Sequence, residues 1–290
     1  MRPRRSSIIL AYIAVLWALL SLVLLIVLPV PQAYYALDSG EYGHSKLAAT
    51  SKWALSRQDL EEAASGGVVI VEGRGQALTA DEASALLQDA KEGDLVIVYG
   101  PWNATEKILE YIGFKGEYLG RVLDPVENVG DPGVIVASIP QDNYSIVLSR
   151  PYAVNLTPVR GGVAAEPLAF SSPFSYIDEN GDDRYDVGEP IGESVVAYRV
   201  LVGRGEILVF CAEGFLTNSV FDYNIKWLTS TYGNRTIFLD QSWTRGNPLL
   251  YIKLLVYATQ GVAPIYVSSI ALVLLVVAVY VHRFSVREGR

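Results

Sequence analysis

The residues best suited to chemistry lie in one acidic stretch, "SYIDENGDDRYDVGEP", at positions 175–190. Oxygen-bearing side chains recur there at the spacing of an EF-hand-type calcium loop, in which position seven binds through its backbone carbonyl. Position six is normally glycine, and here it is Asp183, a residue type that tolerates a positive φ better than most. The alternative is an acidic turn held by its own Asx hydrogen bonds. The spacing predicts a structural Ca²⁺ site with the ligands Asp178, Asn180, Asp182, Arg184, Asp186 and Glu189.

A second group of polar residues follows the ends of predicted strands, where sheets of the α/β class bind ligands. The turn "ALDSGEYGHSK" precedes a predicted helix and could bind an anion through its backbone N–H groups. The alternative is a turn that needs its glycines and is capped by Ser45. The ligand-binding candidates are Ser39, Gly43, His44, Glu72, Trp102, Asn103, Glu213 and Asn218.

Residues for nucleophilic catalysis are scarce. The single cysteine, Cys211, ends an apolar strand, which predicts an inert buried thiol. His44 is the one histidine between the two apolar segments described below, and a structural role is expected for it. Hydrolysis by carboxylates needs at least two of them together, and Glu72, Glu213 and Asp240 are the candidates. We therefore expect a binding protein without enzymatic activity, and a carboxylate-dependent cell-surface hydrolase is the alternative.

Two long apolar segments lie near the two ends of the chain, at 8–30 and 262–281. The first, as a helix, would be about 34 Å long, which is enough to cross a hydrocarbon core of about 30 Å. A cleaved signal peptide is the alternative for it. The basic tails at 1–7 and 282–290 favour cytoplasmic termini, so residues 31–261 should lie outside the plasma membrane.

Charge and glycosylation signals agree with this topology. The whole chain has a net charge of −8 and its two tails carry +3 and +2, so residues 31–261 have a net charge of −13. A region this acidic argues against nucleic acid as a partner. Four of nine asparagines stand in N-glycosylation triplets, a modification restricted to the outer side. These glycosylation candidates are Asn103, Asn143, Asn155 and Asn234.

The hydrophobic pattern between the apolar segments alternates between helix and strand. We expect helices at 45–55, 79–93, 103–114 and 223–233, with apolar strands at 66–73 and 94–100 among them. Strands apolar on both faces predict a parallel sheet covered by helices. Later segments at 133–139, 144–149, 194–203 and 205–211 are richer in strand, followed by one at 235–240 and a helix from Asn247. The fold class is thus α/β with three layers, and a β-rich insertion at about 133–200 holds the acidic loop.

Several segments together are similar to a known family. "VVIVEGRGQALTADEASALL", "EGDLVIVYGPWNATEKILEYIGF" and "SPFSYIDENGDDRYDVGEPIGESVVAYRVLVGRGEILVFCAEGFLTNSVFDYNIKWL" resemble uncharacterised prokaryotic, in particular archaeal, membrane-anchored proteins. The resemblance covers most of 35–245. It implies a flavodoxin-like ectodomain of the class I glutamine-amidotransferase type, without the catalytic cysteine of true amidotransferases.

The resemblance also implies a role beside larger membrane systems, such as transport complexes or assemblies with AAA+ ATPases. Together with the double anchor, it favours an accessory subunit that binds a protein partner or a small ligand outside the cell. Apart from Ca²⁺, no cofactor is expected.

Overall fold

The computed structural model describes residues 30–56, 58–60, 67–159, 164–233 and 235–258, with five single positions between 13 and 21. The chain divides into two units, residues 31–243 and the two terminal segments 1–30 and 244–290. In the described part of the chain, no helix is long and apolar enough to span a bilayer. The predicted span 262–281 lies outside the described residues, as does 8–30 apart from a few single positions.

The unit 31–243 is built on one mixed sheet. Its twelve described strands run in the order β1-β12-β2-β3-β10-β9-β7-β5-β6-β4-β8, and β11 pairs with β6 beside this path. The first five strands of the order are parallel to one another. The predicted α/β class is confirmed. These parallel strands are β1 (Lys52–Ala54), β12 (Ile237–Asp240), β2 (Val69–Gly73), β3 (Leu95–Tyr99) and β10 (Gly205–Phe210).

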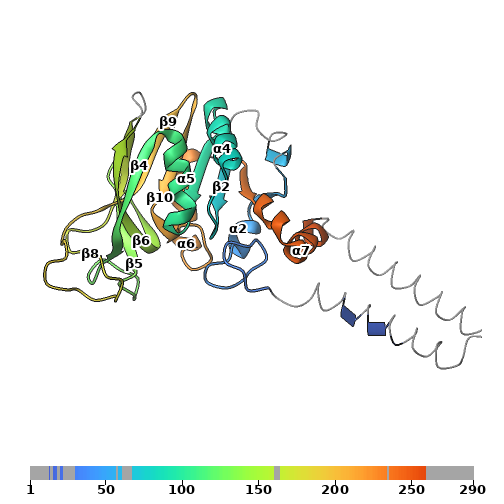
Figure 1. Cartoon of the computed structure of the whole chain (residues 1–290), viewed down its shortest axis with the longest axis horizontal. Helices are drawn as coiled ribbons and strands as arrows, with labels where there is room; N and C mark the ends of the chain where they lie inside the picture. The colour runs from blue at the N-terminus through green and yellow to red at the C-terminus, as the bar shows by residue number, and fades with distance from the viewer. Residues whose placement is uncertain are drawn as a thin grey trace, which may run out of the picture. The chain divides into compact units, whose positions relative to one another are not determined.

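The other strands are antiparallel and extend the sheet from β10 outward (Figure 1). They begin at Phe114, earlier than the predicted insertion, because the segment after the second central helix continues directly as a ten-residue strand. Their bounds are β4 (Phe114–Leu123), β5 (Val134–Ile139), β6 (Tyr144–Pro158), β7 (Ala165–Phe170), β8 (Tyr176–Asp178), β9 (Val195–Val202) and β11 (Ala212–Gly214).

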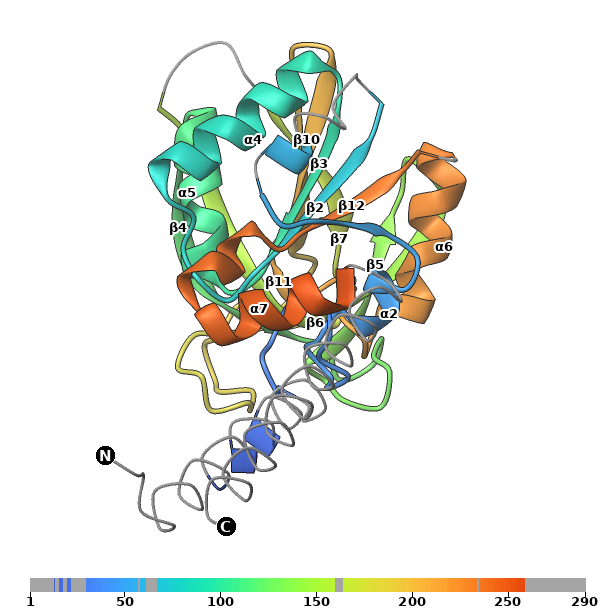
Figure 2. The same cartoon turned by 90° about the vertical axis from the view of Figure 1, so that its right-hand side faces the viewer.

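Helices cover both faces of the sheet. Figure 2 shows α4 and α5 on one side and α6 on the other. Thr79 caps α4, because its hydroxyl accepts the N–H of Glu82 while the Glu82 carboxylate accepts the N–H of Thr79. Among the described residues, the helices with defined bounds are α2 (Ser45–Ala48), α4 (Ala80–Glu92), α5 (Trp102–Ile112), α6 (Phe221–Tyr232) and the 3₁₀ turn η1 (Ser242–Gly246), while α7 (Pro248–Ala258) belongs to the other unit.

Two helix predictions need correction. The helix expected at 45–55 ends at Ala48, because Ser51 Oγ and Trp53 Nε1 donate to the carbonyls of Leu47 and Ala48 and the chain then extends into β1. The helix expected to start at Asn103 starts one residue earlier, with Pro101 as N-cap, so Asn103 does not cap it.

Alternate residues of the central strands pack into two core layers. Ile70, Val98 and Val209 belong to the cluster beneath α4 and α5. On the other side, the rings of Phe210 and Phe215 stack with centroids 3.6 Å apart, and Trp227 of α6 packs edge-on against both. Successive side chains along a strand point to opposite faces of the sheet. The position of each polar residue in this alternation therefore decides on which face of the sheet its side chain lies.

Candidate functional site

The parallel strands end at a common edge, and two acidic residues meet there. Glu72 lies near the end of β2, and Asp240 ends the neighbouring strand β12, whose Leu239 pairs with Val71. The register therefore sets the two carboxylates side by side on the face that α4 covers. The strand order also reverses here, since β2 leads to β3 on one side while β12 returns to the other. Ligands of α/β sheets bind at such positions.

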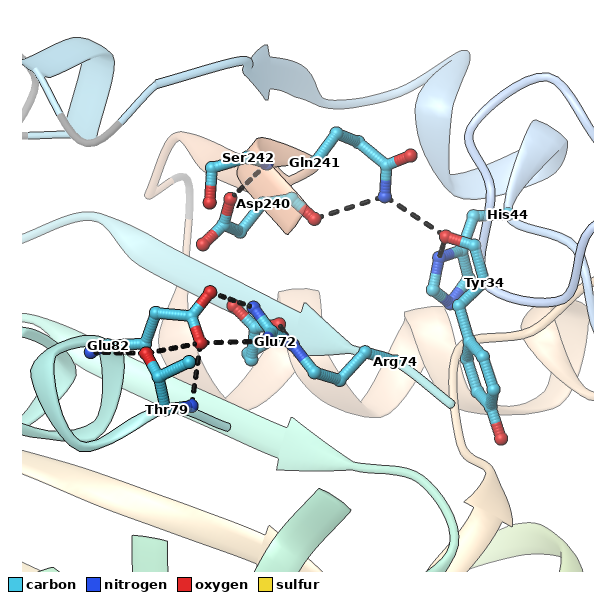
Figure 3. A network of polar contacts seen from close by, with 9 residues as sticks. All are labelled: Tyr34, His44, Glu72, Arg74, Thr79, Glu82, Asp240, Gln241 and Ser242. Atoms are coloured by element: carbon cyan, nitrogen blue, oxygen red, sulfur yellow. Dashed lines mark hydrogen bonds and ion pairs between the residues drawn. The ribbon is translucent and has the colours of Figure 1, made fainter. Parts of the chain in front are cut away.

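An arginine joins this edge to the start of α4. Arg74 Nε donates to Glu72 Oε1 at 2.5 Å, and its two terminal nitrogens donate to the carboxylate of Glu82 at 3.1 and 3.2 Å (Figure 3). Burial raises the pKa of Glu82, but Arg74 and the bonds from Thr79 outweigh burial, so the pKa of Glu82 is lowered. Arg74 is only 3% exposed and thus forms a buried bridge between strand and helix.

Of these side chains, Glu72 is the one whose charged form is most strongly disfavoured by its surroundings. It is fully buried, and its Oε2 has no hydrogen-bond partner. Burial raises the pKa of Glu72 well above its usual value; Arg74 opposes this, and the negative charge of Asp240 adds to it. Asp240 is 5% exposed and accepts the backbone N–H of Ser242 at 2.7 Å. Two adjacent buried carboxylates of unequal character are the arrangement that general acid–base chemistry uses.

His44 lies on the opposite face of the same strands. Its Nδ1 is 2.9 Å from the carbonyl oxygen of Tyr34, which can only accept, so Nδ1 holds the proton and Nε2 accepts from the Tyr99 hydroxyl at 2.5 Å. Burial lowers the pKa of His44 to about 4, so the ring is neutral. A Cβ on Gly73 would lie 2.6–2.7 Å from the Tyr99 ring and from His44 Cε1. The glycine is required because these two rings occupy its side-chain space.

The chain's own N-terminal segment fills the strand edge. Tyr34, Tyr35 and Ala36 are buried. The amide of Gln241 fixes this segment, because its Oε1 accepts the N–H of Ala36 and its Nε2 donates to the carbonyl of Tyr34 (Figure 3). The crevice expected beyond the strand ends is therefore occupied by residues 34–44.

The turn before α2 is held by Asn218. The Nδ2 of Asn218 donates to the carbonyls of Asp38 and Gly40, while its Oδ1 accepts the N–H of Lys46. The N–H groups of residues 43, 44 and 45 donate to the carbonyls of Gly40, Tyr35 and Asp38, respectively. They do not form the anion-binding nest proposed from the sequence, and Asn218 rather than Ser45 supplies the cap. Ser39 is exposed, and a Cβ on Gly43 would clash with the Asp38 carbonyl at 2.0 Å.

The remaining ligand-binding candidates lie apart from Glu72. Glu213 Oε2 accepts from Arg150 at 3.3 Å. Trp102 packs over Gly116, where a Cβ would be 2.3 Å from the indole ring. Asn103 is exposed on α5. The structure thus brings together Ser39, Gly43, His44 and Asn218 around one turn, and Trp102, Asn103 and Glu213 are not part of this turn.

Cys211 is fully buried between β10 and β11, as expected of an inert thiol. Burial raises the pKa of this thiol to about 12, so the nucleophilic thiolate is absent at neutral pH.

The acidic loop follows β8 and has no flanking helices. Asp178 is 1% exposed, and its carboxylate accepts the N–H groups of Gly181 at 2.6 Å and Asp183 at 2.9 Å. Asp183 has a φ of +62°, the conformation for which an EF-hand loop uses glycine. The two oxygens of Glu189 accept the N–H groups of Glu179 and Asp186. Among the described residues, no three His, Cys, Asp or Glu side chains are grouped to hold a metal. The calcium site stays a prediction.

Three of the four glycosylation candidates, Asn103, Asn143 and Asn155, are exposed, and Asn234 lies outside the described residues. Their occupancy stays a prediction.

Comparison with known proteins places the chain in a family. A family model described as "Domain of unknown function (DUF4350)" matches residues 48–229. The chain belongs to this family. The match agrees with the resemblance to a family without an assigned function. No curated protein matches the DUF4350 chain significantly.

Solved structures are similar only at low identity. The mmIFT52 N-terminal domain is 12% identical, with 61% of this chain and 78% of that one covered and a TM-score of 0.41. The exo-β-1,4-mannosidase Op5Man5 of Opitutaceae bacterium strain TAV5 is 16% identical, with 57% and 23% covered and a TM-score of 0.29. The β-galactosidase Gan42B is 10% identical, with 58% and 22% covered and a TM-score of 0.35. The DUF4350 chain spans less than a quarter of the length of these two glycosidases.

The sequence reasoning missed the residues that connect the edge. Arg74 and Gln241 directly follow predicted strands and Tyr99 is the second-last residue of another, but none of the three was a candidate. A polar residue at the end of a buried strand was the available signal.

Proposed function

We propose that this DUF4350 protein is an extracytoplasmic binding domain, tethered to the plasma membrane by segments 8–30 and 262–281, that serves as an accessory subunit of a larger membrane system and is not an enzyme. The observation that carries the proposal is that residues 34–44 cover the carboxyl ends of the parallel strands, an arrangement we call the closed strand edge. The polar groups of His44 and Asn218 and the Oε1 atom of Glu72 bond to the chain's own residues, and all three side chains are almost wholly buried. Groups used up in this way position a fold rather than a substrate.

The thiol chemistry of amidotransferases finds no support in this chain. The turn after β3 reads Gly100-Pro101-Trp102, and the single cysteine is buried elsewhere. Parallel strands with helices on both faces support the flavodoxin-like, amidotransferase-like description of the domain. A structural Ca²⁺ in the acidic loop belongs to the proposal as well. Its support is the Asp183 backbone conformation and the spacing of the oxygen ligands.

The test uses the full-length protein in its native membrane. A membrane-impermeant cross-linker should trap it with a discrete, saturable partner outside the cell, and Glu72→Gln and Asp240→Asn should leave that product unchanged. The same two variants should have no effect in assays on glycan and peptide panels, because wild type should show no turnover there. Absence of a discrete product at saturating cross-linker would contradict the proposal.

A carboxylate-dependent surface hydrolase is the second candidate, and one observation favours it. Glu72 and Asp240 form a carboxylate pair at a strand-order reversal, and the raised pKa of Glu72 suits a general acid. A substrate would reach the pair only after residues 34–44 moved. Turnover of a glycan or peptide by wild type, lost in Glu72→Gln, would establish this function in place of the first.

A further inference from the structure

A small polar cavity lies outside the closed edge. It has a volume of about 260 Å³ and lies between the turn at residues 41–42, the segment 131–134, the end of β4 and the middle of β6. This is slightly below the range of about 300–1,000 Å³ typical of ligand pockets, so only a small ligand fits. Glu41 and Tyr42 of the segment 34–44 line it, whereas Glu72, His44 and Asn218 do not. Its charged lining residues are Glu41, Arg121, Asp131, Arg150 and Asp183.

Two guanidinium groups face this cavity with donors to spare. Arg121 Nη1 is paired with Asp183, and Arg150 Nη1 lies 3.3 Å from Glu213 Oε2. A guanidinium has five N–H donors in a fixed fork, and these contacts use one on each side chain. The Arg150 guanidinium also lies over the ring of Tyr42, 5.2 Å from its centroid. Both arginines are thus held in place while keeping donors for an oxyanion.

The backbone is shaped to aim Arg150. It has a φ of +48°, in the left-handed region that non-glycine residues rarely adopt, and its N–H donates to the carbonyl of Gly133 at 2.7 Å. Such conformations persist only where the surroundings enforce them, and they concentrate at ligand-binding positions. The neighbouring Ser149 and Tyr42 hydroxyls, 3.4 Å apart, add groups that can donate or accept.

The charge balance of the lining selects the ligand. Two arginines and three carboxylates give the cavity a net charge of −1, within a domain of strongly negative charge. A ligand with only a negative charge gains no net electrostatic attraction there, and a ligand with only a positive charge is repelled by the two guanidinium groups. A molecule with one carboxylate and one ammonium group satisfies both signs. Asp131 has an oxygen left for the ammonium group, because its Oδ1 accepts the N–H of Gly133 at 2.8 Å.

We infer that this cavity binds a small zwitterion, of the chemical class of a free α-amino acid, with the carboxylate on Arg121 and Arg150 and the ammonium group on Asp131. The inference rests on the proposed binding function and names its ligand class. The ligand-efficiency ceiling of about 1.5 kcal/mol per heavy atom allows a six-atom ligand a dissociation constant of about 0.3 µM at best, so we expect micromolar to millimolar binding for amino acids of about six to ten heavy atoms.

The test is isothermal titration calorimetry on the full-length protein at low salt. L-Alanine, L-leucine and L-glutamine are the probes, and acetate and methylammonium each supply one charge only. At least one amino acid should bind, while the two single-charge compounds bind at least tenfold more weakly. Arg150→Gln and Asp131→Asn should each weaken binding at least tenfold. Asp131→Asn retains the Oδ1 acceptor for Gly133, so the turn should persist.

Arg204→Gln is the matched control, because Arg204 is exposed at a distant turn and donates to the carbonyl of Glu92. It should leave binding unchanged, and thermal melting should show all variants folded. Absence of heat with every amino acid up to about 10 mM overturns the inference, as does acetate binding as tightly as an amino acid. Binding unaffected by Arg150→Gln and Asp131→Asn also overturns it. An intact cross-linked partner in any of these cases would show that the proposed binding function survives without the zwitterion.

Discussion

The neutral His44 makes the stability of the domain depend on pH in a calculable way. An unperturbed histidine has a pKa of 6.5, and burial lowers that of His44 to about 4. Above pH 6.5 neither the folded nor the unfolded state holds the proton. Between pH 6.5 and 4 the unfolded chain binds a proton that the folded protein does not, so stability falls as the pH falls.

The size of the loss follows from the two pKa values. Each unit is worth about 1.36 kcal/mol, so a difference of 2.5 units gives about 3 kcal/mol below pH 4 and about 2.5 kcal/mol at pH 4.5. Glu72 acts with the opposite sign, because its raised pKa costs stability at neutral pH and this cost is relieved on acidification. The effect of His44 must therefore be isolated by comparison with a variant.

The measurement is a urea titration of wild type and His44→Gln at several pH values between 7 and 4.5, followed by tryptophan fluorescence. His44→Gln should be less stable at pH 7, and the difference from wild type should shrink by about 2.5 kcal/mol by pH 4.5. With a slope of about 2–3 kcal/mol per molar urea, this is a relative midpoint shift of about 1 M. A constant difference across the pH range would refute the assignment of a buried, neutral His44.

Further measurements test the packing, the topology and the acidic loop. Gly73→Ala should destabilise the domain by about 1–3 kcal/mol and lower its Tm by several degrees, because the added Cβ would clash with the rings of Tyr99 and His44. Gly246→Ala is the control and should change the Tm little, because no atom lies within 4 Å of the added Cβ. Tyr223→Cys, at a side chain 49% exposed, should react with a membrane-impermeant maleimide on intact cells, while the buried Cys211 of wild type should not; labelling only after lysis would contradict the topology. With 10 mM calcium in place of EGTA, stability should rise by about 1.4–2.7 kcal/mol, and Asp178→Ala should abolish the rise; coincident melting curves would leave a solvated turn.

The periodic part of the fold was predictable from the sequence. Strands apolar on both faces and the helical pattern at 79–93 predicted β2, α4 and β3 to within a few residues. Such signals are local, because a strand buried on both faces and a capped helix each leave their pattern in consecutive residues. The antiparallel strands β4 and β8 were missed because glycines interrupt the first and the second has three residues.

The candidate site was less predictable because it depends on long-range register. Glu72 and Asp240 were both named, but their pairing follows from β12 lying beside β2, which no local pattern indicates. The role of Asn218 likewise depends on contacts with residues about 180 positions away. The segment 34–44 reads as a polar turn, and only the folded sheet shows that it fills the crevice.

The order of the strands has a consequence for biosynthesis. The central strand β3 pairs on one side with β10, which is synthesised about a hundred residues later, and β2 pairs with β12, which comes later still. Long-range parallel pairs form slowly, because the chain between them must first be closed into a loop. During translation, β2 and β3 are therefore complete, with α4 and α5 available to cover one face, while their outer edges and the other face remain uncovered until residue 240 has emerged. We expect the nascent chain to depend on a chaperone during this interval.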